Sequence, residues 1–267
     1  MGTIVLFHAH PDDEVTSTGG TIATLSRAGH RVIVVTATDG SEGEVPDGCD
    51  RSELAAIRSA ELAVAAEVLG VHRSVELGYA DSGMDGEESN QNPRCFARVD
   101  VDEAAGRLAS ILTQESADAL TIYDDHGGYG HPDHVAVHHV GIRAAEMAGV
   151  QRVYEATMNR DAIQEMMAQA GEHGLDPEGS DDGPTEDEMA TIGMTAAEIT
   201  HHIDVADQAM TKRTALVAHS SQVSPDSFFL AMPDELFAMV FGTESYRSRD
   251  GSTGTVPADL LPAEPTG

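Results

Sequence analysis

The chain has 267 residues, of which 40% are hydrophobic, and 46 acidic against 15 basic residues give it a formal net charge of −31. This length suits one large domain with a sizeable core. Such an acidic surface repels nucleic acid and anionic membranes, so neither is an expected partner. No apolar run reaches membrane-spanning length, and no basic segment precedes the apolar run at Thr3, so we expect neither membrane insertion nor a signal peptide.

Two features of the composition bear on the cell compartment. Cys49 and Cys95 fit neither a zinc knuckle nor a redox pair, so we expect unpaired thiols in a reducing cytoplasm. The dense carboxylates either serve general solubility or keep the protein hydrated in a high-salt cytoplasm, and the charge alone leaves both explanations open. The sequence favours no particular oligomeric state.

The first 156 residues alternate between strand-like and helix-like segments. Strands are predicted at residues 3–9, 31–37, 74–77, 119–123 and 150–156. Helices are predicted from about 21 to Gly29 and at residues 52–69, 101–113 and 132–148. The loop at 78–93 is too long for a simple connection and suggests a binding element. This order predicts an α/β fold with a mostly parallel sheet flanked by helices.

The rest of the chain is expected to form a smaller C-terminal elaboration of the same domain, which we place at residues 1–248. Residues 171–189 are rich in Gly, Asp and Glu and are interpreted as an acidic surface excursion. Helices are predicted at 204–219 and 227–241, and residues 249–267 are expected to be a mobile tail.

Two clusters follow predicted strands, His10-Pro11-Asp12-Asp13-Glu14 and Tyr129-Gly130-His131-Pro132-Asp133-His134. One such cluster alone favours a turn and a helix start, whereas two favour a metal site. A turn at the carboxyl end of a strand can aim His10 and Asp13 at one metal ion, with His134 as the third ligand. This set leaves a position open for water, as catalytic zinc requires. Fe²⁺ also suits two histidines and one aspartate.

The remaining polar residues of the clusters are assigned to proton transfer. Asp12 is the expected general base. His131, when protonated, would stabilise an oxyanion or protonate a leaving amine, and Asp133 could hold it in the required state. Tyr129 could donate a hydrogen bond to the oxyanion. Glu14 is expected at a helix N-terminus or beside a ligand.

Three residues outside this set keep two interpretations each. Arg58 either pairs with Glu53 or Glu61 on its own helix or contacts the substrate. His219 either caps a helix or contacts the substrate. His8 is expected on the opposite face of its strand, as a buried residue or as a partner of a ligand.

The paired motifs resemble the PIG-L/LmbE family of zinc-dependent de-N-acetylases, from the first strand to about residue 150, with a weaker echo at residues 218–223. The resemblance implies a Rossmann-like fold. It implies zinc ligands at His10, Asp13 and His134 and a general base at Asp12. It also implies that His131 and Tyr129 polarise the amide and stabilise the transition state.

Further motifs are similar to the mycothiol branch of this family, namely Gly43-Glu44-Val45-Pro46-Asp47-Gly48, Arg58 with Glu61-Leu62, and Asp81-Ser82-Gly83-Met84. In that branch the position of Arg58 contributes to substrate binding. The expected activity is therefore zinc-dependent hydrolysis of the N-acetyl group of an amino-sugar substrate, such as an N-acetylglucosaminyl-inositol. Alternatives are a mycothiol S-conjugate-type amidase and a non-catalytic metal- or sugar-binding protein on the same scaffold. A phosphatase is disfavoured, because the motifs show neither extra cations nor a second metal site.

Overall fold

The computed structural model describes residues 1–172 and 191–263, and in these ranges seven strands form one sheet in the order β3-β2-β1-β4-β5-β7-β6. The strands are β1 (Thr3–His8), β2 (Arg31–Thr38), β3 (Arg73–Tyr79), β4 (Ala119–Tyr123), β5 (Arg152–Thr157), β6 (His201–Asp204) and β7 (Thr243–Ser248). The strands β1 to β5 are parallel, and β7 runs antiparallel to both β5 and β6. The predicted α/β class and mostly parallel sheet are confirmed.

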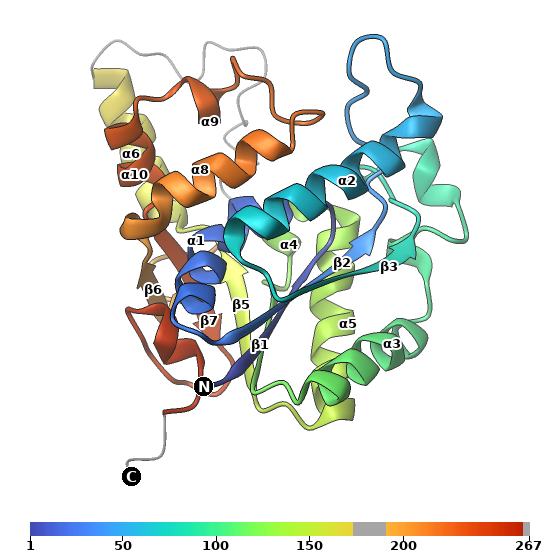
Figure 1. Ribbon diagram of the computed structural model, residues 1–267, viewed down its shortest axis with the longest axis horizontal. Helices are drawn as coiled ribbons and strands as arrows, with labels where there is room; N and C mark the ends of the chain where they lie inside the picture. The colour runs from blue at the N-terminus through green and yellow to red at the C-terminus, as the bar shows by residue number, and fades with distance from the viewer. Residues whose placement is uncertain (173–190, 264–267) are drawn as a thin grey trace.

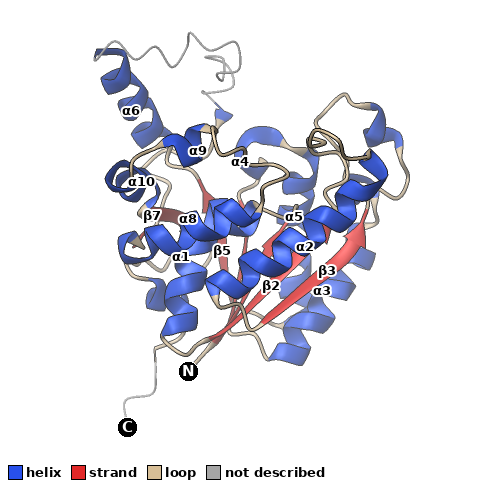
Figure 2. Cartoon of the chain, turned by 45° about the horizontal axis from the view of Figure 1, so that its top comes forward, coloured by secondary structure: helices blue, strands red, loops and turns tan. Residues whose placement is uncertain are grey.

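Helices cover both faces of the sheet (Figures 1 and 2). One layer consists of α1 (Asp13–Arg27), α2 (Arg51–Leu69) and α8 (Ala209–Ala218), and the other of α3 (Val101–Glu115) and α5 (Pro132–Ala148). The central strand β1 is therefore buried on both sides, which explains why its sequence is a continuous apolar run instead of an alternating one. The shorter helices are α4 (Gly127–Gly130), α6 (Arg160–Glu172), α9 (Phe228–Ala231) and α10 (Asp234–Phe241).

The helix ends follow local sequence signals. The side chain of Asp50 accepts the backbone N–H of Ser52, while Glu53 reaches back to the Asp50 N–H, so a capping box starts α2. Gly70, with φ of 76°, ends that helix in the left-handed conformation. Pro132 occupies the first turn of α5, as predicted.

The C-terminal third differs from the predicted helices. The segment predicted as one helix at 204–219 begins as the end of β6 and becomes helical in α8, and the segment 227–241 is divided into α9 and α10 at Pro233. Both β6 and β7 were missed. The inward positions of β7 are Glu244, Tyr246 and Ser248, whose polar groups conceal the alternation that a half-buried strand usually shows.

Part of the segment expected to be a mobile tail contacts the domain. After Ser248 the backbone N–H of Arg249 bonds to the carbonyl of Val153, and Leu260 and Leu261 are buried in the common apolar core. These two leucines explain why residues 249–263 pack against the domain. The expected acidic excursion at 171–189 lies outside the described residues, apart from its first two residues at the end of α6. In the described ranges no helix is both long and apolar enough to cross a membrane.

Candidate metal centre and catalytic pocket

The two sequence clusters meet at the carboxyl edge of the sheet. The strands β1 and β4 are parallel neighbours, with Leu6 opposite Thr121, so the segments that follow them leave the sheet side by side. The first segment enters α1, and the second forms α4 and enters α5. Residues more than a hundred positions apart in the sequence therefore face one small volume, at the edge where ligands bind in open α/β sheets.

Three side-chain atoms form a nearly equilateral triangle there. The distance from His10 Nδ1 to Asp13 Oδ2 is 3.3 Å, and His134 Nε2 lies 3.4 Å from each of these atoms. Tetrahedral ligands with bonds of about 2.0–2.2 Å lie about 3.3–3.6 Å apart, so this buried donor set fits a metal ion. These three atoms would occupy three corners of a tetrahedral coordination shell, which leaves the fourth corner for another ligand.

The charge state of the carboxylate suits the same role. Burial tends to raise the pKa of Asp13, but the charges of His134 and His10 and their hydrogen bonds hold it well below its usual range. Asp13 is therefore a carboxylate over the whole physiological pH range.

The other ring nitrogen of His10 faces two carboxylates. Its Nε2 lies 3.3 Å from Asp133 Oδ2 and 3.5 Å from Asp81 Oδ1. Asp133 is completely buried and accepts hydrogen bonds from the N–H and the hydroxyl of Ser82. A carboxylate on the far nitrogen orients a ligating imidazole and increases its basicity.

This arrangement corrects the expected role of Asp133. Its carboxylate contacts His10 and Ser82, while only its backbone N–H reaches His131, by donating to Nδ1 at 3.1 Å. The reason is local: His131 is the N-cap of α5 and uses its ring to bind the N–H of Asp133, which directs the Asp133 side chain toward the neighbouring loop.

Asp12 lies beside the triad in a strained backbone conformation, with φ of 124°. The surroundings hold this conformation in place. The N–H of Asp12 donates to Glu14 Oε2 at 2.9 Å, and Glu14 Oε1 lies 2.8 Å from His219 Nε2. Glu14 and His219 are both completely buried. The expectation that Glu14 lies at a helix N-terminus is confirmed, and His219 contacts Glu14.

Arg58 contacts residues outside its own helix, which the sequence did not predict. Its guanidinium is buried and donates to the carbonyls of Pro11 and Gly40 and, at 3.1 Å, to Asp12 Oδ2. The expected pairs with Glu53 or Glu61 are absent from the ion pairs of the described residues. Burial raises the pKa of Asp12 to about 6, against the lowering effect of Arg58.

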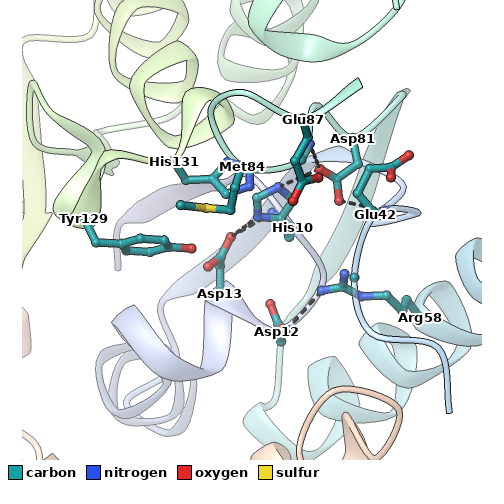
Figure 3. Close-up of a pocket in the computed structure, with 12 residues that line it drawn as sticks. His10, Asp12, Asp13, Glu42, Arg58, Asp81, Met84, Glu87, Tyr129 and His131 are labelled. Carbon is teal, nitrogen blue, oxygen red and sulfur yellow. Dashed lines mark hydrogen bonds and ion pairs between the residues drawn. The ribbon is translucent and has the colours of Figure 1, made fainter. Parts of the chain in front are cut away.

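Tyr129 and His131 lie across the pocket from Asp12 (Figure 3). Although Tyr129 is 47% exposed, desolvation within the pocket raises the pKa of its hydroxyl, which therefore remains a hydrogen-bond donor. Burial and the neighbouring His10 and His134 lower the pKa of His131 to about 4. Because Nδ1 of His131 accepts a backbone N–H, the proton of the neutral ring lies on Nε2. Both effects favour a neutral ring that donates from Nε2 over the expected imidazolium.

The pocket has a volume of about 260 Å³ and is strongly acidic. Besides the predicted residues it contains several that the sequence reasoning did not assign, namely Glu42, Asp81, Met84 and Glu87. Asp81 follows β3 just as His10 follows β1, and this common position at strand ends was the available signal. His8 is buried, as expected, and its two ring nitrogens each lie 3.0 Å from a hydroxyl, those of Tyr123 and Thr18.

Comparisons with known proteins agree with this geometry. The sequence pattern of the PIG-L family, described as GlcNAc-PI de-N-acetylase, matches residues 5–145. The chain belongs to this family. It is 35% identical to a 1D-myo-inositol 2-acetamido-2-deoxy-alpha-D-glucopyranoside deacetylase from Salinispora arenicola, over 94% of this chain and 86% of that protein. An enzyme of the same name from Thermobifida fusca is 36% identical, over 93% of this chain and 96% of that protein.

The solved structure of a deacetylase has a similar fold. The N,N'-diacetylchitobiose deacetylase from Pyrococcus horikoshii superposes with a TM-score of 0.60 at 26% identity, covering 93% of this chain and 84% of that one. The expected membership of the PIG-L family is confirmed, and with it the expected class of hydrolytic deacetylases.

Proposed function

We propose that this PIG-L protein uses a zinc ion to hydrolyse the N-acetyl group of an amino sugar, with an N-acetylglucosaminyl-inositol as the natural type of substrate. The observation that carries the proposal is the triangle of His10, Asp13 and His134 beside a separate carboxylate, Asp12. Both cysteines are free thiols, which supports a cytoplasmic location.

A bound zinc ion would supply Lewis acidity, lowering the pKa of a water molecule and polarising the amide carbonyl. Iron(II) would suit the same donors. The chain itself supplies the base, because Asp12 lies outside the ligand triangle and lines the open pocket. With a pKa of about 6, its carboxylate is ionised at neutral pH and can take a proton from water.

Two donors opposite Asp12 would stabilise the charge that develops on the amide oxygen. The hydroxyl of Tyr129 and the Nε2–H of His131 are both uncharged donors, and both residues line the pocket. Because neutral His131 has no spare proton to release, the proton that Asp12 takes from water is the one available for the departing amine.

The pocket also supports a polyhydroxyl substrate. The carboxylates of Glu42, Asp81 and Glu87 can accept hydrogen bonds from sugar hydroxyls, and Arg58 can donate to them. The curated relatives carry names that specify a 2-acetamido-2-deoxy-glucopyranoside of myo-inositol as substrate. At 35–36% identity over nearly the whole chain, this substrate class is the natural first choice for the protein.

An amine-release assay with fluorescamine tests the proposal. N-acetylglucosamine, its inositol-linked derivative and thiol-conjugated derivatives would be incubated with chelated and zinc-loaded enzyme. We expect release from the inositol-linked compound by the zinc-loaded enzyme alone. Absence of release from every compound by a zinc-loaded, folded protein would instead indicate a binding protein.

The role of Asp12 is tested in the same assay. Replacement by alanine should leave the metal content unchanged and reduce turnover by at least about two orders of magnitude, the contribution of a positioned base. Asp47→Asn, on the exposed loop before α2, is the control and should keep full turnover. Normal turnover in Asp12→Ala would eliminate Asp12 as the base.

A further inference from the structure

A second and larger cavity lies at the β3 edge of the sheet. Its volume is about 540 Å³, and it has no lining residue in common with the catalytic pocket. It lies against the segment that joins β3 to α3, which Figure 1 shows at the right-hand edge of the molecule. Three arginines line it, Arg94, Arg98 and Arg107, in a chain with only 15 basic residues.

Eight arginines of the described residues form ion pairs with carboxylates, whereas these three do not. Elsewhere two arginines share Glu115 and two share Glu155. None of the three in the cavity wall forms an ion pair with a described residue, although Asp39, Asp100 and Glu103 line the same cavity. The three carboxylates balance the arginines in the cavity as a whole, but none lies within ion-pair distance of a guanidinium, so these groups are available to an external anion.

Neutral contacts hold two of these side chains in place. Arg98 Nη1 donates to the carbonyl of Asn90 and to Gln91 Oε1. The guanidinium of Arg107 lies 4.7 Å from the ring centroid of Tyr79 and donates to the carbonyl of Leu77. These contacts orient the positive charges without neutralising them.

Tyr79 provides an independent observation. It lines the cavity, is only 9% exposed, and its hydroxyl is a buried polar atom without a hydrogen-bond partner among the described residues. Buried hydroxyls are nearly always satisfied, so this one marks a place where a partner is missing.

We propose that this cavity binds a small sugar phosphate. Phosphate is the anion that several arginines recognise best, because each guanidinium can donate two parallel hydrogen bonds to its oxygens. The volume exceeds that of a bare phosphate group. The carboxylates of Asp39, Asp100 and Glu103 give the rest of the cavity acceptors for hydroxyl groups. The cavity is separate from the catalytic pocket. A negative result for one proposal would therefore not contradict the other.

Calorimetric titration of the full-length protein tests the site, with glucose 6-phosphate and inorganic phosphate as probes. Arg94→Gln and Arg98→Gln remove cavity arginines. Arg27→Gln is the matched control, because Arg27 is exposed, has no carboxylate partner and lies at the end of α1. We expect each cavity variant to bind glucose 6-phosphate about tenfold more weakly than the wild type, the control to bind normally, and added salt to weaken binding.

Two results would overturn the proposal. If glucose 6-phosphate bound all four proteins equally, or bound none of them, the cavity would not be its site. If inorganic phosphate bound as tightly as glucose 6-phosphate, the cavity would not recognise the sugar. Circular dichroism of each variant distinguishes a lost site from a lost fold.

Discussion

Replacement of Arg58 by glutamine should shift the pH dependence of catalysis toward alkaline pH. Arg58 Nη2 lies 3.1 Å from Asp12 Oδ2, and the guanidinium is the strongest of the positive charges that lower the Asp12 pKa against the effect of burial. The neutral amide of glutamine removes that charge. The protonated form of Asp12 is then favoured more strongly than in the wild type.

The size of the shift follows from the strength of one hydrogen bond. A hydrogen bond to a charged group contributes about 1.5–3 kcal/mol, and one pKa unit corresponds to about 1.4 kcal/mol. The pKa of Asp12, about 6 in the wild type, should therefore rise by about one to two units in Arg58→Gln. Because the carboxylate is the active form, activity is lost as the pH falls through this pKa, and the acidic limb should move to about pH 7–8.

The measurement is kcat/KM for amine release between pH 5 and 9, with the position of the limb, not the height of the plateau, as the readout. Arg143→Gln serves as control, because Arg143 pairs with Asp102 and Glu146 on the surface of α5. Its limb should coincide with that of the wild type. An unchanged limb in a metal-loaded Arg58→Gln enzyme would show that Arg58 does not set the Asp12 pKa.

Four further predictions concern stability and the metal. Lys212→Met should lower the free energy of unfolding in urea titrations by roughly 3–5 kcal/mol, because it leaves the buried carboxylate of Glu244 without the ammonium group that lies 2.8 Å away. A change below about 0.5 kcal/mol would contradict this. His134→Ala should purify without metal, and a stoichiometric ion in elemental analysis would exclude His134 as a ligand. His219→Ala should keep its metal but lose about 10–100-fold in kcat, because Glu14 loses its partner; unchanged kcat would remove His219 from the support of Asp12. The melting temperature should rise from dilute buffer to molar KCl as salt screens the acidic surface, and a fall would refute adaptation to high salt.

The convergence of the three proposed metal ligands could be predicted from the sequence because a single rule places them. Both clusters follow apolar strands, and parallel neighbouring strands present their carboxyl ends at one edge. This rule alone is enough to predict that His10, Asp13 and His134 lie close together. The partner of Asp133 could not be predicted in the same way, because it depends on which atom caps α5. Once His131 takes the N–H of Asp133, the carboxylate turns to Ser82 and His10.

The antiparallel edge was missed because its stabilising contacts are polar and distant in sequence. Glu244 on β7 accepts the backbone N–H groups of Gly20 and Thr21 in α1 and pairs with Lys212 of α8. Neither β6 nor β7, taken alone, has a sequence pattern that predicts a strand. The only lysine of the chain is thus a buried structural residue, so all basic groups on the surface of the protein apart from histidines and the N-terminus are arginines.

The three consecutive acids at the start of α1 show how one turn of backbone creates distinct chemical roles. Asp13 faces two imidazoles, which hold its pKa low and suit it to the proposed role of metal ligand. Asp12, turned away by its φ of 124°, faces Arg58 instead of the two imidazoles, and its pKa of about 6 suits the proposed role of base. Glu14 points inward and holds the Asp12 N–H. Neighbouring carboxylates with separated pKa values are typical of sites that divide acid–base roles. The strained backbone at Asp12 is therefore what separates the proposed base from the proposed ligand.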